Sequence, residues 1–359
     1  MSFQEEVRQG ILPLDEGSMR EAAQRLDQLT KPPGSLGQLE SLIIRWCGIT
    51  GGKMPRHPAK GVLLMAGDHG VVSEGVTPYP QTVTAQMVQN ILAGGAAINA
   101  VARAVRAQVT VVDVGVCQEL PEHPRLWRQK VRPGTANLMR AQAMTLEEAE
   151  QAVRVGINAA CRLAETGVQV LALGEMGIGN TTPSSCLLAA LTGLPAEQVV
   201  GMGTSMDERT YRRKVTVVKE ALRFHRLEGG VGKDDLLHVM ACVGGLEIAA
   251  LAGAVIGAAR ARIPVVLDGF IVTVAGLWAV RFCPPVKPYL FTSHVSAEKG
   301  HQIALDLLDQ RAPLHFQMRL GEGTGAGMML SAFDVAAEVH WGMATFAEAG
   351  VDNRKGEGA

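Results

Sequence analysis

Residues 168–183 read VQVLALGEMGIGNTTP and indicate the class of fold. Val168–Leu173 is a short, nearly continuous apolar run, as expected of a parallel strand that is covered on both faces. A glycine-rich loop follows this run, and Thr182-Pro183 have the pattern of a helix start, with an N-cap residue before an N1 proline. A buried strand, a loop and a helix in this order form one unit of an α/β sheet.

The same alternation recurs on both sides of this unit. Further strand-like runs are Gly61–Ala66, Val109–Val114, Pro264–Leu267 and Tyr289–Thr292. The longer helical patterns between them are Ile91–Arg106, Thr145–Glu165 and Leu246–Arg260. Thr145 and Glu148 form a capping box at the start of the second helix. We therefore predict an α/β fold with a doubly wound, mostly parallel sheet.

The two ends of the chain differ from its middle, because residues 1–50 and 328–359 have helical patterns and no strand-like run. A length of 359 residues is compatible with two domains. We predict that both ends form one small helical domain. Residues 51–327 are then the α/β domain that binds substrate and carries the catalytic site.

Composition argues against several classes of partner. The net charge is −1 and basic residues do not cluster, so nucleic acid is not expected. The longest uncharged apolar runs, Ile248–Ala259 and Gly269–Val280, have 12 residues each, whereas a membrane-spanning helix needs about 20. The N-terminus has no apolar signal segment. We expect a cytoplasmic protein without a membrane partner, and the 47 % hydrophobic content suggests a buried subunit interface.

The cysteines and histidines do not have the spacing of metal ligands. No C-x-x-C pair and no H-E-x-x-H motif occurs, so we predict reduced thiols and no metal site. The six cysteines are Cys47, Cys117, Cys161, Cys186, Cys242 and Cys283.

The loop Arg319–Gly327 (RLGEGTGAG) places one carboxylate, Glu322, among glycine, threonine and alanine. The apolar, helix-like stretch Ala326–Val339 follows it, and the free N–H groups of a helix start suit a carboxylate or a substrate anion. Glu322 is therefore a candidate catalytic base, with a solvated turn as the alternative. Residues 321–326 also match the G-x-G-x-x-G/A fingerprint, but the 32 residues after Gly327 contain no convincing second strand. We therefore do not expect a dinucleotide cofactor.

Two other loops, one at Glu175 and one at residues 199–208, have polar residues that suit a nucleotide. Glu175 follows a buried strand and could accept hydrogen bonds from ribose hydroxyls, or cap the next helix. The segment VVGMGTSMDE (199–208) has two glycines before a capping box at Ser205 and Glu208, with Lys214 two turns further on. It is either a phosphate cradle or a helix start without a ligand.

Ser296 is predicted to be the N-cap of a helix over Ala297–Leu308, and it could also donate to a ligand. Asp68-His69 resembles an acid–base pair, but adjacent residues on an extended chain point to opposite sides. No complete P-loop or serine acylase pattern is found.

Together these loops resemble one family over essentially the whole chain, nicotinate-nucleotide–dimethylbenzimidazole phosphoribosyltransferase, which acts in assembling the lower nucleotide loop of cobalamin. Seven motifs in order make this match more specific than any single loop. The matching segments are KPPGSLG (31–37), GDHGVVSEGV (67–76), YPQTVTAQMV (79–88), GEMGIGNTTP (174–183), VLDGF (266–270), SHVSAEKG (293–300) and RLGEGTGAG (319–327).

The resemblance implies a parallel six-stranded α/β domain, a small helical domain from both termini, and a homodimer in which the partner closes the active site. It implies transfer of the 5-phosphoribosyl group of nicotinate mononucleotide to 5,6-dimethylbenzimidazole with inversion, and no cofactor. By motif position Glu322 corresponds to the catalytic base. The nucleotide-binding positions are Glu175, Gly177, Gly203, Lys214, Asp268 and Ser296. The base-binding positions are Tyr79, Gln86, Met87 and Leu320.

The chain departs from the best-studied family pattern in the base pocket. That pattern has a serine and a glutamine where this chain has Tyr79 and Met87, with Gln86 one residue away. The identity of the accepted base is therefore open. Two other functions are alternatives: a nucleotide hydrolase that uses water in place of the aromatic base, and a nucleotide-binding protein without turnover.

Overall fold

The computed structural model describes residues 2–203, 207–232 and 235–353. Its centre is a six-stranded sheet in the order β3-β2-β1-β4-β5-β6, and every neighbouring pair is parallel. The strands are β1 (Lys60–Gly67), β2 (Ala107–Gly115), β3 (Leu126–Arg128), β4 (Val170–Met176), β5 (Val265–Leu267) and β6 (Leu290–Thr292). The predicted fold class and all the predicted strands are confirmed. The edge strand β3 was not predicted.

The chain divides into two compact units, one with the residues up to Ile11 and Ala59–Leu330, the other with Leu12–Pro58 and the residues from Ser331 on. The larger unit contains the sheet. Its α-helices are α1 (Phe3–Arg8), α4 (Thr82–Ala93), α5 (Ala97–Ala104), α6 (Leu146–Glu165), α7 (Thr181–Thr192), α8 (Ala196–Val199), α9 (Glu208–Phe224), α10 (Leu236–Val243), α11 (Leu246–Arg260), α12 (Phe270–Phe282) and α13 (Lys299–Leu308). The larger unit also contains the 3₁₀ segments Gly70–Glu74 and Pro284–Tyr289.

The first helix belongs to the larger unit because its side chains are bound there. Gln4 Nε2 and Arg8 Nη2 donate to the carbonyl of Phe282 at 2.8 and 3.1 Å. Arg154 of α6 also pairs with the Glu6 carboxylate. The helical unit therefore begins after α1 in the structure, later than the predicted start at residue 1.

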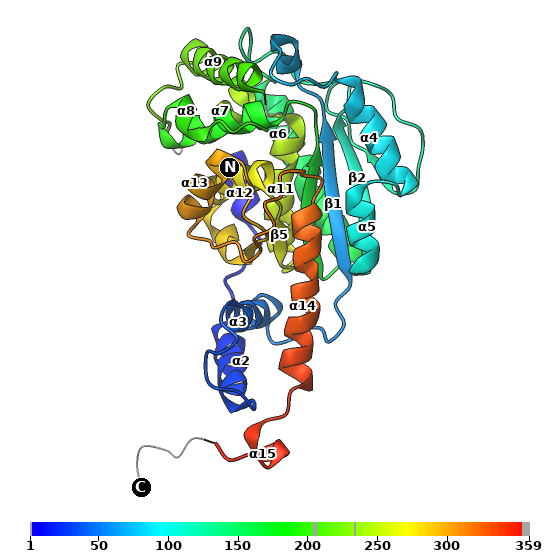
Figure 1. Cartoon of the computed structure of the whole chain (residues 1–359), viewed down its shortest axis with the longest axis vertical. Helices are drawn as coiled ribbons and strands as arrows, with labels where there is room; N and C mark the ends of the chain where they lie inside the picture. The colour runs from blue at the N-terminus through cyan, green and yellow to red at the C-terminus, as the bar shows by residue number, and fades with distance from the viewer. Residues whose placement is uncertain (1, 204–206, 233–234, 354–359) are drawn as a thin grey trace. The chain divides into compact units, whose positions relative to one another are not determined.

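Helices cover both faces of the sheet (Figure 1). Helices α4 and α5 lie on one face, and α11 and α12 lie on the other, where α6 packs against α11. Helices α6 and α11 approach closely at Gly156, where an added Cβ would collide with the carbonyl oxygen of Ala250. The close approach buries nearly all of α11, which explains the uncharged apolar run Ile248–Ala259 within it.

The helix predicted over Leu246–Arg260 is confirmed, as is the capping box of α6, in which Thr145 Oγ1 accepts the Glu148 N–H at 3.1 Å. The single helix predicted over Ile91–Arg106 is wrong. Helix α4 ends at Ala93 because Gly94 takes the left-handed conformation, with φ of 87°, and α5 starts three residues later.

Two predicted helix starts are also shifted. Asn180, not Thr182, is the N-cap of α7. Glu298, not Ser296, is the N-cap of α13, although Ser296 Oγ accepts the backbone N–H of Glu298 at 3.3 Å. In both cases the sequence predicted a helix near the right place, but a neighbouring polar residue takes the cap position.

The smaller unit is helical, with α2 (Glu16–Gln28), α3 (Gln38–Thr50), α15 (Phe346–Ala349) and the part of α14 (Thr324–Gly342) from Ser331 on. Trp46 and Phe333 form its core, with ring centroids 5.1 Å apart in an edge-to-face arrangement. Lys31 and Glu40 form a buried ion pair at 2.8 Å, which holds the KPPGSLG segment against α3.

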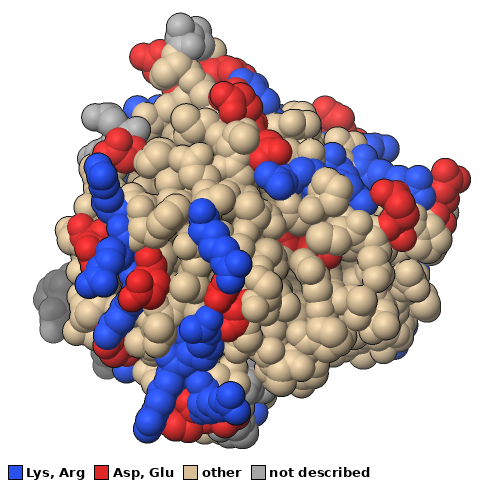
Figure 2. All heavy atoms as spheres, turned by 90° about the horizontal axis from the view of Figure 1, so that it is seen from above, with Lys and Arg blue, Asp and Glu red and all other residues tan. Residues whose placement is uncertain are grey.

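On the face of the molecule that Figure 2 shows, basic side chains lie among acidic ones, so neither sign of charge dominates this face. Within the described residues no helix has both the length and the apolar character to span a bilayer. All six cysteines are free thiols.

Candidate functional site

The strand order reverses direction between β1 and β4, because β1 leads to β2 on one side and β4 leads to β5 on the other. Loops that leave the carboxyl ends of two such strands diverge to opposite faces and leave a crevice, which is where α/β sheets bind ligands. A cavity of about 290 Å³ lies at this place in the larger unit. It is lined by the loop after β1, the β4–α7 loop, the start of α12 and the segment before α14.

The structure brings together most of the site residues predicted from the sequence. Those that line the cavity are Tyr79, Met87, Glu175, Gly177, Gly203, Lys214, Asp268, Ser296, Leu320 and Glu322. They come from segments up to 243 positions apart, since Tyr79 and Glu322 share one cavity.

Gln86 is the predicted residue that does not line the cavity. It is exposed on α4, whereas Val83 and Met87 of the same helix face the cavity. Residues four apart share a helix face, and the neighbouring position lies about 100° round the axis. The structure therefore gives no support for Gln86 as a base-binding residue.

Glu322 lies in an unusual backbone conformation. Its φ is 60°, and its neighbours Gly321 and Gly323 have φ of 87° and 75°. A non-glycine residue in the left-handed region costs about 1–3 kcal/mol and is found at functional sites when its surroundings hold it in place. The conformation is held here because the backbone N–H of Glu322 donates to the carboxylate of Glu175.

The Glu322 carboxylate is buried, with 6 % of the residue exposed. It accepts the backbone N–H of Ile98, in the first turn of α5, which lowers its pKa, while its Oε2 atom has no hydrogen-bond partner among the described residues. Burial is the largest influence and raises the pKa of Glu322 above its ordinary value, and the charge of Asp268 raises it further. A carboxylate with one free oxygen and a raised pKa is suited to accept a proton near neutral pH.

Asp268 follows β5 and anchors the glycine loop. Its Oδ2 accepts the N–H of Gly323 at 3.1 Å and its Oδ1 accepts the N–H of Ala326 at 3.0 Å. Burial raises the pKa of Asp268 to about 6, against the effect of these N–H donors. Both oxygens thus accept backbone N–H groups from the glycine loop and the start of α14, so this side chain positions the loop that presents Glu322.

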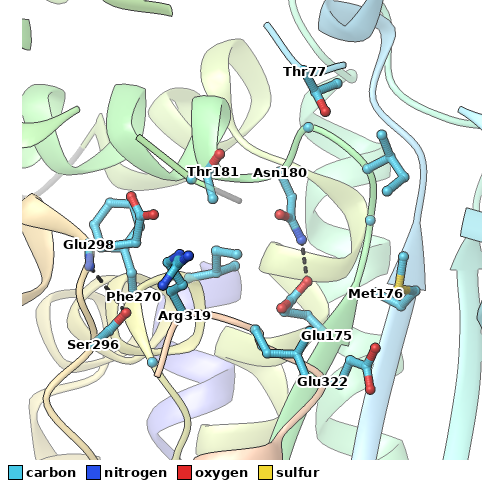
Figure 3. A pocket seen from close by; sticks show the side chains of 18 of the residues that line it. Thr77, Glu175, Met176, Asn180, Thr181, Phe270, Ser296, Glu298, Arg319 and Glu322 are labelled. Carbon is cyan, nitrogen blue, oxygen red and sulfur yellow. Dashed lines mark hydrogen bonds between the residues drawn. The ribbon is translucent and has the colours of Figure 1, made fainter. Parts of the chain in front are cut away.

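Glu175, near the end of β4, forms the other side of the loop. Its carboxylate accepts from the Asn180 side-chain amide, as Figure 3 shows. Burial raises the pKa of Glu175 to about 8, and the charges of Glu247 and Asp268 add to the rise. Gly321 passes so close that an added Cβ would collide with Glu175 Oε1, which explains the glycine there. At neutral pH this carboxyl is mostly protonated and can donate as well as accept a hydrogen bond.

The opposite end of the cavity carries cations. Lys214 of α9 is only 3 % exposed, and its Nζ donates to Thr181 Oγ1 at 2.8 Å. Burial lowers the pKa of Lys214, and the nearby Glu298 carboxylate opposes that effect. Ser296 and Arg319 line the same end, and Figure 3 shows Arg319 between Ser296 and the Glu175 side. Cations and a hydroxyl at this end suit a bound anion.

The helix that carries Lys214 does not start as predicted. It begins at Glu208, and Asp207 caps it by accepting the N–H groups of Arg209 and Thr210 at 3.2 and 3.0 Å. The predicted N-cap, Ser205, lies outside the described residues.

The remaining wall is apolar and opens to solvent. Tyr79 and Leu320 are 46 % and 50 % exposed at the rim, and Val83, Met87 and Met176 line the interior. A flat aromatic ring fits such a lining, whereas a charged group does not.

The side chains of Asp68 and His69 have different hydrogen-bond partners. The His69 ring lies 2.7 Å from Glu247, and Asp68 Oδ2 accepts the N–H of Cys117 at 2.8 Å. The two side chains therefore point to different partners, as the extended backbone predicted, and neither lines the cavity.

Sequence reasoning missed several lining residues. They are Asn180, Thr181, Phe270, Glu298 and Arg319. Each lies inside one of the motifs that carried the resemblance, so the motifs located the segments. The motifs did not say which side chains of a loop face the cavity, because a loop has no fixed periodicity.

Comparisons with known proteins identify the family of the chain. A family model described as phosphoribosyltransferase matches residues 11–351. The nicotinate-nucleotide–dimethylbenzimidazole phosphoribosyltransferase of Chloroflexus aggregans is 48% identical over 99% of this chain and 99% of the relative. The enzyme of the same name from Pseudomonas putida is 44% identical over 97% of this chain and 98% of the relative.

A solved structure gives the same result. The crystal structure of CobT from Thermus thermophilus matches with a TM-score of 0.88 at 48% sequence identity, and the match covers 94% of this chain and 99% of that chain. The chain therefore belongs to the nicotinate-nucleotide–dimethylbenzimidazole phosphoribosyltransferase family.

Proposed function

We propose that this cavity transfers the 5-phosphoribosyl group of nicotinate mononucleotide to 5,6-dimethylbenzimidazole, with Glu322 as the general base. The products are α-ribazole 5′-phosphate and nicotinate, and the reaction belongs to cobalamin synthesis. The observation that carries the proposal is the buried Glu322 carboxylate, which lines a cavity with a cationic end and an apolar wall. Its pKa is raised, and its Oε2 atom has no hydrogen-bond partner among the described residues.

The chemistry needs one proton acceptor and no acid. The pyridinium of nicotinate mononucleotide is cationic at the bond to C1′, so it leaves as neutral pyridine nitrogen without protonation. A glycosidase, in contrast, needs two carboxylates because its leaving group is an alkoxide. The benzimidazole nitrogen attacks C1′ opposite the leaving group, the configuration changes from β to α, and Glu322 takes the proton from the other ring nitrogen.

The other site residues bind or position the nucleotide. Glu175 faces the ribose hydroxyls, since its protonated carboxyl both donates and accepts. Lys214, the backbone at Gly203 and the hydroxyl of Ser296 hold the phosphate and nicotinate groups. Asp268 acts through the glycine loop that it anchors. Much of the rate acceleration then comes from holding the two reactants in line.

The base pocket should accept more than one base. Its walls at Tyr79, Met87 and Leu320 are apolar or aromatic, and such walls discriminate weakly, about 10- to 200-fold per group. We expect several benzimidazoles, and adenine at a lower rate, to be substrates. Selection of one base by more than about ten-thousandfold would contradict this view of the pocket.

We also propose that the chain works as a cytoplasmic homodimer. The exposed apolar side chains at the cavity rim, Tyr79, Leu320 and Met202 at 39 %, are suited to contact with a second copy. Six free thiols suit a reducing compartment. Sedimentation equilibrium tests the dimer directly, and a monomer at micromolar concentration would count against it.

One experiment separates the proposed function from its alternatives. The protein is incubated with nicotinate mononucleotide and a panel of bases, and the products are identified by mass. The phosphoribosyltransferase gives the ribotide of each accepted base. A hydrolase gives ribose 5-phosphate even with dimethylbenzimidazole present, and a silent binding protein gives no product.

A further inference from the structure

Glu298 is an acid in the anion-binding end of the cavity that the transfer reaction does not explain. It is 8 % exposed and lines the cavity together with Lys214 and Arg319. Its Oε2 atom has no hydrogen-bond partner among the described side chains and backbone groups. A buried carboxylate oxygen without a partner is costly, so its retention at a ligand site calls for a role.

The surroundings of Glu298 are those of an anion site. The backbone N–H of Gly203 donates to its carboxylate, and Lys214 of α9 and Arg319 of the segment before α14 are the cations that face it. The carboxylate also lies directly against Gly201, where an added Cβ would collide with Oε2. The Glu298 carboxylate thus interacts with the same glycine loop and the same cations that are proposed to hold the nucleotide phosphate.

The groups next to Glu298 on its own segment do not neutralise it. Ser296 Oγ accepts the backbone N–H of Glu298 at 3.3 Å. His301 Nδ1 accepts the N–H of Ser296 at 2.9 Å and its other ring nitrogen lies 3.0 Å from Thr273 Oγ1. Burial lowers the pKa of His301 to about 3, so this ring is neutral. Burial raises the pKa of Glu298 itself, against the effects of Lys214, the Gly203 N–H and Arg319.

Charge counting shows the conflict that a bound nucleotide creates. Lys214 and Arg319 bring two positive charges, and the phosphate monoester is a dianion above its second pKa of about 6. An ionised Glu298 would leave one uncompensated negative charge in a buried site, at close range to the phosphate. A protonated Glu298 removes that charge and supplies a hydrogen-bond donor, and its Oε2 atom, which has no partner among the described groups, can carry the proton.

We propose that Glu298 takes up a proton from solvent when the nucleotide binds, and that its carboxyl O–H then donates to a phosphate oxygen. The proton returns to solvent when the phosphate leaves. This inference rests on the proposed phosphate site. It makes Glu298 a residue that determines how nucleotide affinity depends on pH. Between the free and bound pKa of Glu298, the Kd of the nucleotide should rise with pH by up to about tenfold per unit.

The test measures proton uptake during binding by calorimetry at pH 8, in two buffers of different ionisation enthalpy. At this pH the phosphate is already a dianion and contributes no proton. The ligands are nicotinate mononucleotide and nicotinate riboside, which lacks the phosphate. The proteins are the wild type and Glu298→Gln, whose amide keeps an acceptor for Gly203 and a donor for phosphate.

The wild type should take up more protons with the mononucleotide than with the riboside, by up to one per site. Glu298→Gln should lose this difference and bind the mononucleotide at pH 8 at least as tightly as the wild type. The riboside should behave alike in both proteins, and it reports any contribution from Glu175, which titrates in the same range. Equal uptake for both ligands in the wild type, or an unchanged difference in Glu298→Gln, would overturn the proposal.

Two controls keep the result interpretable. Thermal melting shows whether Glu298→Gln folds, and if it does not, the comparison of the two ligands in the wild type decides alone. Product formation by the wild type is measured separately. Failure of the proton uptake with normal product formation rejects the role of Glu298, while absence of the transfer product rejects the function itself.

Discussion

Replacing Asp268 by Asn tests whether the glycine loop must be anchored for Glu322 to act. The carboxylate of Asp268 accepts two backbone N–H groups of the loop, from Gly323 and Ala326. Asparagine has nearly the same shape but only one acceptor oxygen. Its NH₂ group would face the second N–H, donor against donor, so that one of the two hydrogen bonds is lost.

The size of the effect follows from this loss. A hydrogen bond to a charged group contributes about 1.5–3 kcal/mol. This free energy is comparable to the cost of about 1–3 kcal/mol for a non-glycine residue in the left-handed region, where Glu322 lies. The loop should therefore leave the active conformation for much of the time. With 1.36 kcal/mol for each tenfold change in rate, kcat should fall about 10- to 150-fold.

Steady-state kinetics with nicotinate mononucleotide and dimethylbenzimidazole measures this effect. We expect a lower kcat, a nearly unchanged KM for the nucleotide, and an acid limb in the pH profile, since Glu322 is still the base. Asp309→Asn is the matched control, because that residue is exposed at the end of α13 and also has a positive φ. A raised nucleotide KM with normal kcat would show that Asp268 binds the nucleotide directly and that the anchoring argument is wrong.

Three further changes test other parts of the structure. Glu322→Gln should lower kcat about 10²–10⁴-fold. It should also remove the acid limb of the pH profile, because in the wild type protonation of this raised-pKa carboxylate at falling pH abolishes the base; a mutant with near-normal kcat would place the base elsewhere. Lys214→Met should raise the nucleotide KM about 10- to 150-fold with a smaller change in kcat, since a phosphate contact is lost in the ground state and transition state alike; an unchanged KM would remove Lys214 from the site. Gly156→Ala should destabilise the fold by about 1–3 kcal/mol in urea unfolding because its Cβ meets the Ala250 carbonyl. The exposed Asn158→Ala in the same helix should stay within about 0.5 kcal/mol, and similar values for the two variants would contradict the packing argument.

The sequence was sufficient for the sheet because its strands are buried on both faces. Such strands need apolar side chains on both sides, so runs such as Val168–Leu173 stand out without an alternating pattern. The edge strand β3, Leu126-Trp127-Arg128, lacked this signal because an edge strand is half exposed and only Leu126 is fully buried. The break between α4 and α5 was present in the sequence as Gly94-Gly95, but the apolar pattern continues across it.

The site was predictable to the level of segments but not of contacts. The motifs placed Glu322, Glu175 and Lys214 in one site, and the structure brings all three to one cavity. They also placed Gln86 in this site. Only knowledge of which face of helix α4 points to the cavity could have corrected this prediction. The anchoring role of Asp268 was not visible, because its partners are backbone N–H groups and these carry no sequence signature.

Three acids, Glu175, Asp268 and Glu322, crowd around the glycine loop. Glu175, Asp268 and Glu322 all have a pKa raised by burial, so they cannot all be ionised together without cost. Asp268, with a pKa of about 6 and several backbone N–H donors, is mostly ionised at neutral pH. Glu175, with a pKa of about 8, stays mostly protonated. Burial thus separates the pKa values of the two flanking acids, and both carboxyls are engaged by backbone or side-chain donors. Glu322 has an oxygen without a partner among the described residues, which makes it the acid best placed to accept the proton of the incoming base.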